Sequence, residues 1–140
     1  MSANLDLVRS IYATWERGDY RSDEWADPEI ELVITGGPAP GRSRGLVGMA
    51  EAMRDWLGAW EDFHQEAEEY RELDSERVLV LARWGGRGKT SGLELGQVRA
   101  KGASLFHIRD ERVTSLVVYW DRERMPADLG PTSEAGSERS

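Results

Sequence analysis

The feature that most constrains the fold of this 140-residue chain is a pair of apolar segments near its C-terminal end. Residues 103–109 and 113–121 are rich in β-branched and aromatic residues, and the charged sequence Asp-Glu-Arg at 110–112 separates them. Two such runs joined by a short polar turn predict a β-hairpin.

The second of these strands is apolar on both faces. Side chains alternate along a strand, so Leu116, Val118 and Trp120 share one face, while Val117 and Tyr119 share the other. A strand that is apolar on both faces is normally covered on both. We therefore expect a core or cavity on one side of this sheet and a helix or partner chain on the other.

Helical periodicity appears in the first half of the chain. Residues 4–17 and 46–60 carry apolar residues at the spacing of amphipathic helices. The two expected stripes are Leu5, Val8, Ile11, Tyr12 and Trp15, and then Met49, Met53, Trp56 and Trp60. A short helix is also expected over residues 21–25, ending before Pro28.

The remaining segments predict strands. Alternation over residues 29–35 indicates a strand with Ile30, Leu32 and Ile34 on one face. A Gly/Pro-rich loop follows over 36–41, and a short helix is expected after Arg122. The later strands are expected at 64–73, 77–84, 95–109 and 113–121, with hairpin turns at 74–76 and 85–92. The order α-α-β-α-β-β-β-β predicts an α+β fold with a curved, mainly antiparallel sheet.

Length and composition limit the classes of function. We expect one domain over residues 1–129 and a disordered tail over 130–140, where Gly, Pro, Ser and Glu predominate. The formal net charge of −8 argues against nucleic acid or an anionic membrane as a partner. Without cysteine the chain has no disulfide or thiol nucleophile. Neither His64 nor His107 has another His at the spacing of a metal-binding helix, so a metal site is not expected. No apolar run approaches about 18 residues and no signal peptide is recognisable, which predicts a cytoplasmic protein.

Several short motifs, in their order and spacing, carry a resemblance to a known family. They are Trp15-Glu-Arg-Gly-Asp19, Trp25-Ala-Asp-Pro28, Gly41-Arg-Ser-Arg-Gly45, the segment from Arg83 through Leu93-Glu-Leu95, and the strand pair from Phe106 to Arg124. The chain resembles the nuclear transport factor 2-like superfamily, and within it the SnoaL-like, polyketide cyclase-like bacterial branch. The resemblance implies a cone-shaped sheet around an apolar pocket, no cofactor, and a homodimer through the outer sheet face, where Val117 and Tyr119 would lie.

The same superfamily includes enzymes and non-catalytic binding proteins, so fold alone does not give the function. A ketosteroid isomerase of this fold uses a Tyr, an Asp base and a protonated Asp. Alignment through the motifs puts Ile11, Val33 and Ser104 at those three positions, so isomerase chemistry of that kind is not expected. SnoaL-type cyclases use an Asp base with a supporting His, for which Asp121 and His107 are the candidates by type, although both alternate out of phase with the expected inner face.

Glu31 is the third candidate base. It would be a general base if it faced the cavity among apolar neighbours, and a solvated residue if the Ile/Leu face is the core. Arg42 and Arg44 either lie at the pocket mouth or face solvent. The expected pocket residues are Ile11, Trp15, Val33, Trp56, Trp60, Trp84, Ser104, Phe106, Ile108, Leu116, Val118 and Trp120.

Two functions follow from these observations. One is the binding of a small hydrophobic or aromatic metabolite, with cofactor-independent proton transfer such as cyclisation, isomerisation or dehydration. It requires a pocket of a few hundred cubic ångströms with at least one carboxylate or His. The other is a non-catalytic ligand-binding or dimeric assembly module with a vestigial pocket. The sequence leaves the choice between them open.

Overall fold

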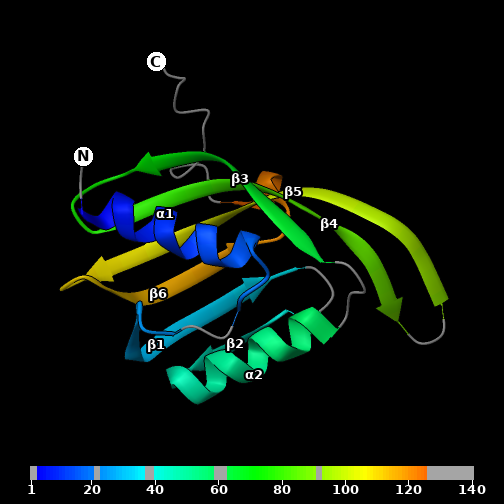
Figure 1. Ribbon diagram of the computed structural model, residues 1–140, viewed down its shortest axis with the longest axis horizontal. Coiled ribbons are helices and arrows are strands. Elements are labelled where there is room, and N and C mark those ends of the chain that lie inside the picture. The colour runs from blue at the N-terminus through cyan, green and yellow to red at the C-terminus, as the bar shows by residue number, and fades with distance from the viewer. Residues whose placement is uncertain (1–2, 21–22, 37–39, 59–62, 91–92, 126–140) are drawn as a thin grey trace.

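The protein folds as a curved six-stranded sheet with two helices on its concave face (Figure 1). The computed structural model describes residues 3–20, 23–36, 40–58, 63–90 and 93–125, with the backbone alone for 87–90, 93–100 and 124. Helix α1 (Ala3–Glu16) packs against one end of the sheet and α2 (Gly45–Gly58) against the other. The expected α+β class is confirmed.

The sheet is mixed and open. Its strands are β1 (Ala26–Thr35), β2 (Gly41–Arg44), β3 (His64–Glu72), β4 (Arg77–Thr90), β5 (Leu93–Arg109) and β6 (Arg112–Tyr119), and a 3₁₀ turn, η1 (Arg122–Arg124), follows. They lie in the order β2-β1-β6-β5-β4-β3. Only the pair β1–β6, the second and third strands in this order, is parallel within this sheet. The first and last strands along the chain are thus neighbours inside the sheet.

Alternation along the strands produces two apolar layers. The inner layer packs the helices against inward side chains, which include Ile30, Leu32, Val78, Phe106 and Leu116. From α1 it receives Val8, Ile11, Tyr12 and Trp15, the stripe expected from periodicity. The outer layer is a smaller cluster of Leu79, Leu81, Ala103, Leu105 and Met125, against which Val117 and Tyr119 pack. The core expected on one face of β6 is confirmed. On the other face Val117 and Tyr119 are only partly buried, and the described residues do not show the helix or partner chain that was expected there.

The hairpin between β5 and β6 is as tight as expected. Asp110 and Glu111 have φ values of 53° and 65°. Positive φ at both central residues is the pattern of a type I′ turn, whose twist matches that of the flanking strands.

Three local predictions were wrong. Residues 23–25 form a turn rather than a helix, and 21–22 lie outside the described residues. The segment Gly41–Arg44, expected to lie in or next to a loop, forms the edge strand β2. Residues 85–90, expected in a hairpin turn, continue β4 in register with β5.

Glycine explains the last of these errors. A Cβ at Gly85 would lie 2.5 Å from Nε2 of His64, so the glycine leaves room for the His64 ring of the neighbouring strand β3. Glycine within a strand often marks such a close approach rather than a turn.

Candidate ligand-binding site

A cavity lies between the inner face of the sheet and α2. Its volume is about 60 Å³, well below the few hundred cubic ångströms expected from the sequence. The lining residues are Trp15, Tyr20, Leu32, Ile34, Met53, Trp56, Leu57, Phe63, Gln65, Trp84, Ser104, Leu116 and Val118. Strands β1, β3, β4, β5 and β6 all contribute to this wall.

Tryptophan rings occupy much of the space beside the cavity. Trp84 and Trp120 are stacked, with ring centroids 6.1 Å apart and planes at 4°, and Trp56 meets Trp120 edge-on at 5.4 Å. Phe63 lies against both Trp56 and Trp84. The cavity is small because these packed rings take up much of the space between the sheet and α2.

The polar part of the lining begins with Tyr20 and Gln65. Tyr20 lies in the segment after α1, where its ring stacks on Trp15 with centroids 6.0 Å apart. Gln65 points inward from β3 and is only 9 % exposed. Its Nε2 donates a hydrogen bond of 3.2 Å to the Tyr20 hydroxyl oxygen. Burial raises the pKa of Tyr20 above its usual value, and the bond from Gln65 partly offsets that rise.

Ser104 is the third lining residue with a side-chain oxygen, and it adjoins Tyr12. The Tyr12 side chain is fully buried, and its hydroxyl makes no hydrogen bond within the described structure. Burial raises the pKa of Tyr12 above its ordinary value, and the neighbouring Ser104 hydroxyl acts in the opposite direction. Thus Tyr12 faces Ser104, the residue that the family alignment puts at the position of the isomerase's protonated Asp.

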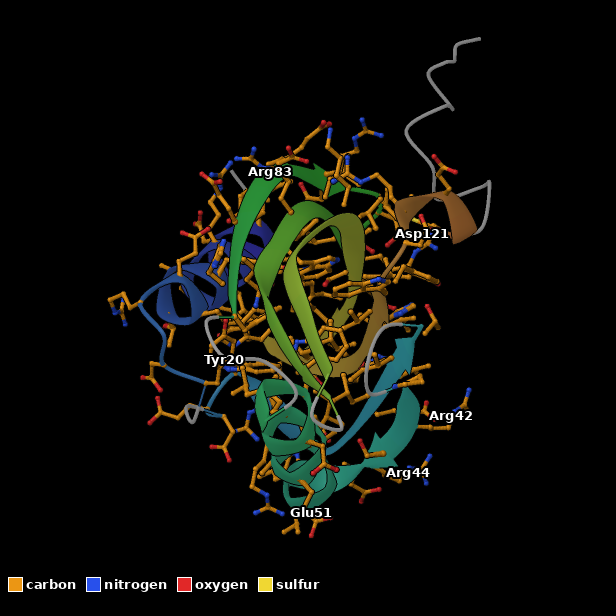
Figure 2. The ribbon with its side chains drawn as sticks, turned by 90° about the vertical axis from the view of Figure 1, so that its right-hand side faces the viewer. Tyr20, Arg42, Arg44, Glu51, Arg83 and Asp121 are labelled. Carbon is orange, nitrogen blue, oxygen red and sulfur yellow. The ribbon has the colours of Figure 1, made fainter. Side chains whose placement is uncertain are left out.

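A wider groove of about 600 Å³ adjoins the cavity on the side of α2. Tyr20, Met53 and Leu57 line both spaces. Asp23 and Arg54 also line the groove. Figure 2 shows Tyr20 between the end of α1 and α2, and its ring is therefore part of the partition between groove and cavity.

Six of the twelve expected pocket residues line the cavity: Trp15, Trp56, Trp84, Ser104, Leu116 and Val118. Ile11, Phe106 and Ile108 are buried in the surrounding core instead. Trp120 contributes through its stacking on Trp84. Trp60 lies outside the described residues.

Val33 was placed in the pocket by the family alignment, and this is wrong. It pairs with Val117 across the parallel ladder and alternates with the buried Leu32 and Ile34, so it lies on the outer face.

None of the three candidate catalytic residues lines the cavity. Glu31 alternates with the inner-face residues, and its carboxylate lies 3.5 Å from Nη1 of Arg42. Asp121 is exposed and caps η1, accepting a 3.0 Å hydrogen bond from the backbone N–H of Glu123. His107 is half-buried and alternates with the inward-facing Phe106. The expectation of a carboxylate or His in the pocket is not met by the residues whose side chains the structure describes.

Arg42 and Arg44 do not lie at the cavity. Figure 2 shows both on the edge strand β2, at the margin of the molecule. Both are exposed, and neither lines the cavity. Within the described ranges, moreover, no group of three His, Asp or Glu side chains is arranged to hold a metal, and no helix is long and apolar enough to cross a membrane.

Tyr20 and Gln65 were not identified from the sequence. Tyr20 follows the helix-ending Gly18-Asp19, where no periodic pattern marks the direction of a side chain. Gln65 is in phase with Ala67, the single small apolar residue among the glutamates of β3, and that phase was the available signal.

Comparison with known proteins confirms the fold and leaves the function open. No protein-family model and no curated protein matches the sequence. An NTF2-like protein from Burkholderia thailandensis E264 superposes with a TM-score of 0.75 at 17 % identity, covering 94 % of this chain and 100 % of that one. A proposed SnoaL-like polyketide cyclase from Jannaschia sp. CCS1 gives 0.66 at 15 % identity over 84 % of each chain. TerC, co-crystallized with polyporic acid, gives 0.70 at 19 % identity, covering 86 % of this chain and 92 % of that one. The chain therefore has the NTF2-like fold.

Proposed function

We propose that this protein binds a flat, apolar small molecule between its sheet and α2, without acid–base chemistry on that ligand. The observation that carries the proposal is the composition of the cavity wall. It is built from aromatic and aliphatic side chains, with Tyr20, Gln65 and Ser104 supplying its few side-chain oxygens. Ligand sites generally combine a mainly apolar wall with a small number of placed polar groups.

The groove supplies the room that the cavity lacks. A volume of about 60 Å³ is too small for a fused ring system, but the cavity shares Tyr20, Met53 and Leu57 of its wall with the groove of about 600 Å³. Methionine is unbranched and adapts easily to a new neighbour. A ligand that displaces the Met53 and Leu57 side chains would occupy both spaces. TerC, which has the same fold, was crystallized with a small molecule, and this is consistent with the proposal.

Binding is favoured over proton-transfer catalysis because of where the carboxylates lie. A general base must come within hydrogen-bonding reach of the proton that it removes. Glu31, Asp121 and His107 are all outside the described cavity wall. Asp23 lines the groove, but it is exposed to solvent rather than set among apolar neighbours that would raise its basicity. The Tyr20 hydroxyl, with its raised pKa, remains protonated at neutral pH and serves as a hydrogen-bond donor rather than a base.

A binding experiment with naphthalene tests the proposal. Tryptophan fluorescence quenching and calorimetry should give a Kd on the order of 10⁻⁵–10⁻⁴ M for a probe of this size. Val118 lines the cavity, so Val118→Phe should fill it and weaken binding at least about tenfold. Val47 is 74 % exposed on α2, which makes Val47→Phe the matched control. Failure of the wild-type protein to bind, or equal binding by the two variants, would contradict the proposal.

We also propose a homodimer through the outer sheet face. Val117 and Tyr119 lie on this face beside the outer apolar cluster and remain partly exposed. Partly exposed apolar residues on one continuous surface favour association with another chain.

A further inference from the structure

The Tyr20–Gln65 hydrogen bond has a direction, and the direction leaves a donor unused. Nε2 of Gln65 donates and the hydroxyl oxygen of Tyr20 accepts. A phenolic hydroxyl can accept and donate at the same time. The Tyr20 proton is donated to no group in the described part of the chain. Tyr20 therefore brings to the cavity wall a donor that a ligand can use.

The surroundings make this donor effective. Trp15 stacks on the Tyr20 ring and Phe63 lies against it, so the ring is fixed from two sides. Gln65 fixes the hydroxyl oxygen from a third side. A polar group in a mainly apolar space gains more from a correctly placed partner than it would in water, because no solvent competes for it. A prearranged donor also loses little conformational entropy when the ligand binds.

The position of Tyr20 indicates which end of the ligand it meets. Tyr20 belongs to the partition between cavity and groove, so its hydroxyl meets the part of a ligand that crosses from one space to the other. Ser104 lies at a different place along the wall. Gln65 pairs with Trp84, and Trp84 pairs with Ala100 of β5, so these three residues lie side by side across the strands. Ser104 is four residues further along β5 than Ala100. At about 3.3 Å per residue, this register corresponds to roughly 13 Å along the strands.

We infer that the ligand is a flat aromatic molecule with an unprotonated hydrogen-bond acceptor, a ring nitrogen or a carbonyl oxygen, that receives the Tyr20 proton. The inference rests on the proposed function and extends it to the chemical class of the ligand. Gln65 acts as a positioning residue, because its amide occupies the Tyr20 oxygen and directs the hydroxyl proton elsewhere. A ligand whose only polar group is a donor gains nothing from Tyr20 in this arrangement.

Naphthalene and quinoline form the matched probe pair. They have nearly the same shape, and quinoline replaces one C–H with an acceptor nitrogen that is unprotonated at pH 7.5. The quantity to compare between variants is the ratio of the two Kd values in each protein. The two probes differ in hydration, but this difference is the same for every variant and cancels when the ratios are compared. Calorimetry at pH 7.5 on the full chain gives both constants.

Tyr20→Phe should weaken quinoline binding about five- to tenfold, the effect of one net hydrogen bond, and leave naphthalene binding within about twofold. Gln65→Glu introduces a carboxylate that accepts the Tyr20 proton, so it should also remove the preference for quinoline. It does so without removing any aromatic ring from the cavity wall. Tyr70→Phe is the control, because Tyr70 is a half-buried tyrosine that lines neither the cavity nor the groove. Its ratio should equal that of the wild-type protein.

The outcomes separate this inference from the proposed function. If the wild-type protein binds naphthalene but Tyr20→Phe changes both probes equally, or neither, the inference is overturned and the binding function stands. If the wild-type protein binds neither probe, both are overturned. Thermal unfolding of each variant, monitored by near-ultraviolet circular dichroism, verifies that the comparison is made on folded protein.

Discussion

The indole Nε1 of Trp84 donates a hydrogen bond of 3.1 Å to the backbone carbonyl of Trp120. The bond joins β4 to the end of β6 across the intervening strand β5. The two rings stack, so Trp84 is held by both its edge and its face. This arrangement is possible only because Gly102 of β5 lies beneath the indole. A Cβ at that position would be 2.2 Å from Nε1 of Trp84 and 2.5 Å from the carbonyl oxygen of Tyr119.

Gly102→Ala should therefore be strongly destabilising. The added methyl group meets both a packed ring and a backbone atom, so we expect a loss of about 2–3 kcal/mol in the free energy of unfolding. Urea denaturation followed by tryptophan fluorescence measures it. Gly58→Ala is the control, because a Cβ at Gly58 meets no atom within 4 Å, and it should be neutral or slightly stabilising. Equal effects of the two substitutions would show that the indole is not fixed over Gly102.

Alternation along the strands was the most reliable signal in the sequence. It placed Ile30, Leu32 and Ile34 on one face, and the structure buries all three. The direction of Glu31 was left open, and the structure places it on the opposite face. At Val33, alternation and the family alignment disagreed, and alternation was correct. A side chain's face follows directly from backbone geometry, whereas a distant alignment tolerates a shift of one residue, and one residue reverses the face.

The polar part of the site was harder to foresee. Tyr12 and Ile11 are adjacent on α1, and both are buried, because the helix is covered over a wide arc. Periodicity identifies the buried arc of the helix, but it does not show which residue of that arc approaches Ser104. Tyr20 lies beyond the helix, where its direction depends on stacking against Trp15, a tertiary contact without a local signature.

Tyr12→Phe should not reduce stability. The Tyr12 hydroxyl is buried and makes no hydrogen bond to the part of the chain that the structure describes, so removing it removes a group that lost its water without gaining a partner. We expect a change in the free energy of unfolding between zero and about 1 kcal/mol in favour of the variant. Chemical denaturation at neutral pH measures this change. A loss of more than about 1 kcal/mol would instead indicate that the hydroxyl bonds to Ser104 in solution.

Glu68 should make folding sensitive to acid. A hydrogen bond from Arg122, 2.8 Å long, holds the pKa of Glu68 below its ordinary value of 4.5. Since the folded state then binds the proton more weakly than the unfolded state, this stabilisation is fully present above about pH 4.5 and is lost as the pH falls through the lower, folded-state pKa. The Glu68→Gln variant should therefore lose less stability than the wild-type protein between pH 5 and pH 3, as measured by urea denaturation across about that range.

Glu51→Gln provides the control for the acid experiment. Glu51 is an exposed residue of α2, and Figure 2 shows it well apart from Asp121, the residue that precedes Arg122. Its substitution should leave the loss of stability between about pH 5 and pH 3 the same as in the wild-type protein. Arg122 also donates to the carbonyl oxygens of Gly102 and Ala82, at 3.2 and 3.0 Å. Those bonds persist in Glu68→Gln, so the variant should remain folded at neutral pH. If Glu68→Gln lost as much stability as the wild-type protein between about pH 5 and pH 3, Glu68 would not be paired with Arg122 in solution.

Tyr119→Asp should convert the proposed dimer into monomers. Tyr119 packs against the outer apolar cluster and is partly exposed, so a charge there would be desolvated in a dimer and hydrated in a monomer. Sedimentation velocity at micromolar concentration should give a dimeric mass for the wild-type protein and a monomeric mass for the variant. Val47→Asp, on the exposed side of α2, should remain dimeric. Because Tyr119 lies on the face opposite the cavity, the monomeric variant should still bind naphthalene, and a wild-type protein that sediments as a monomer would refute the proposed dimer.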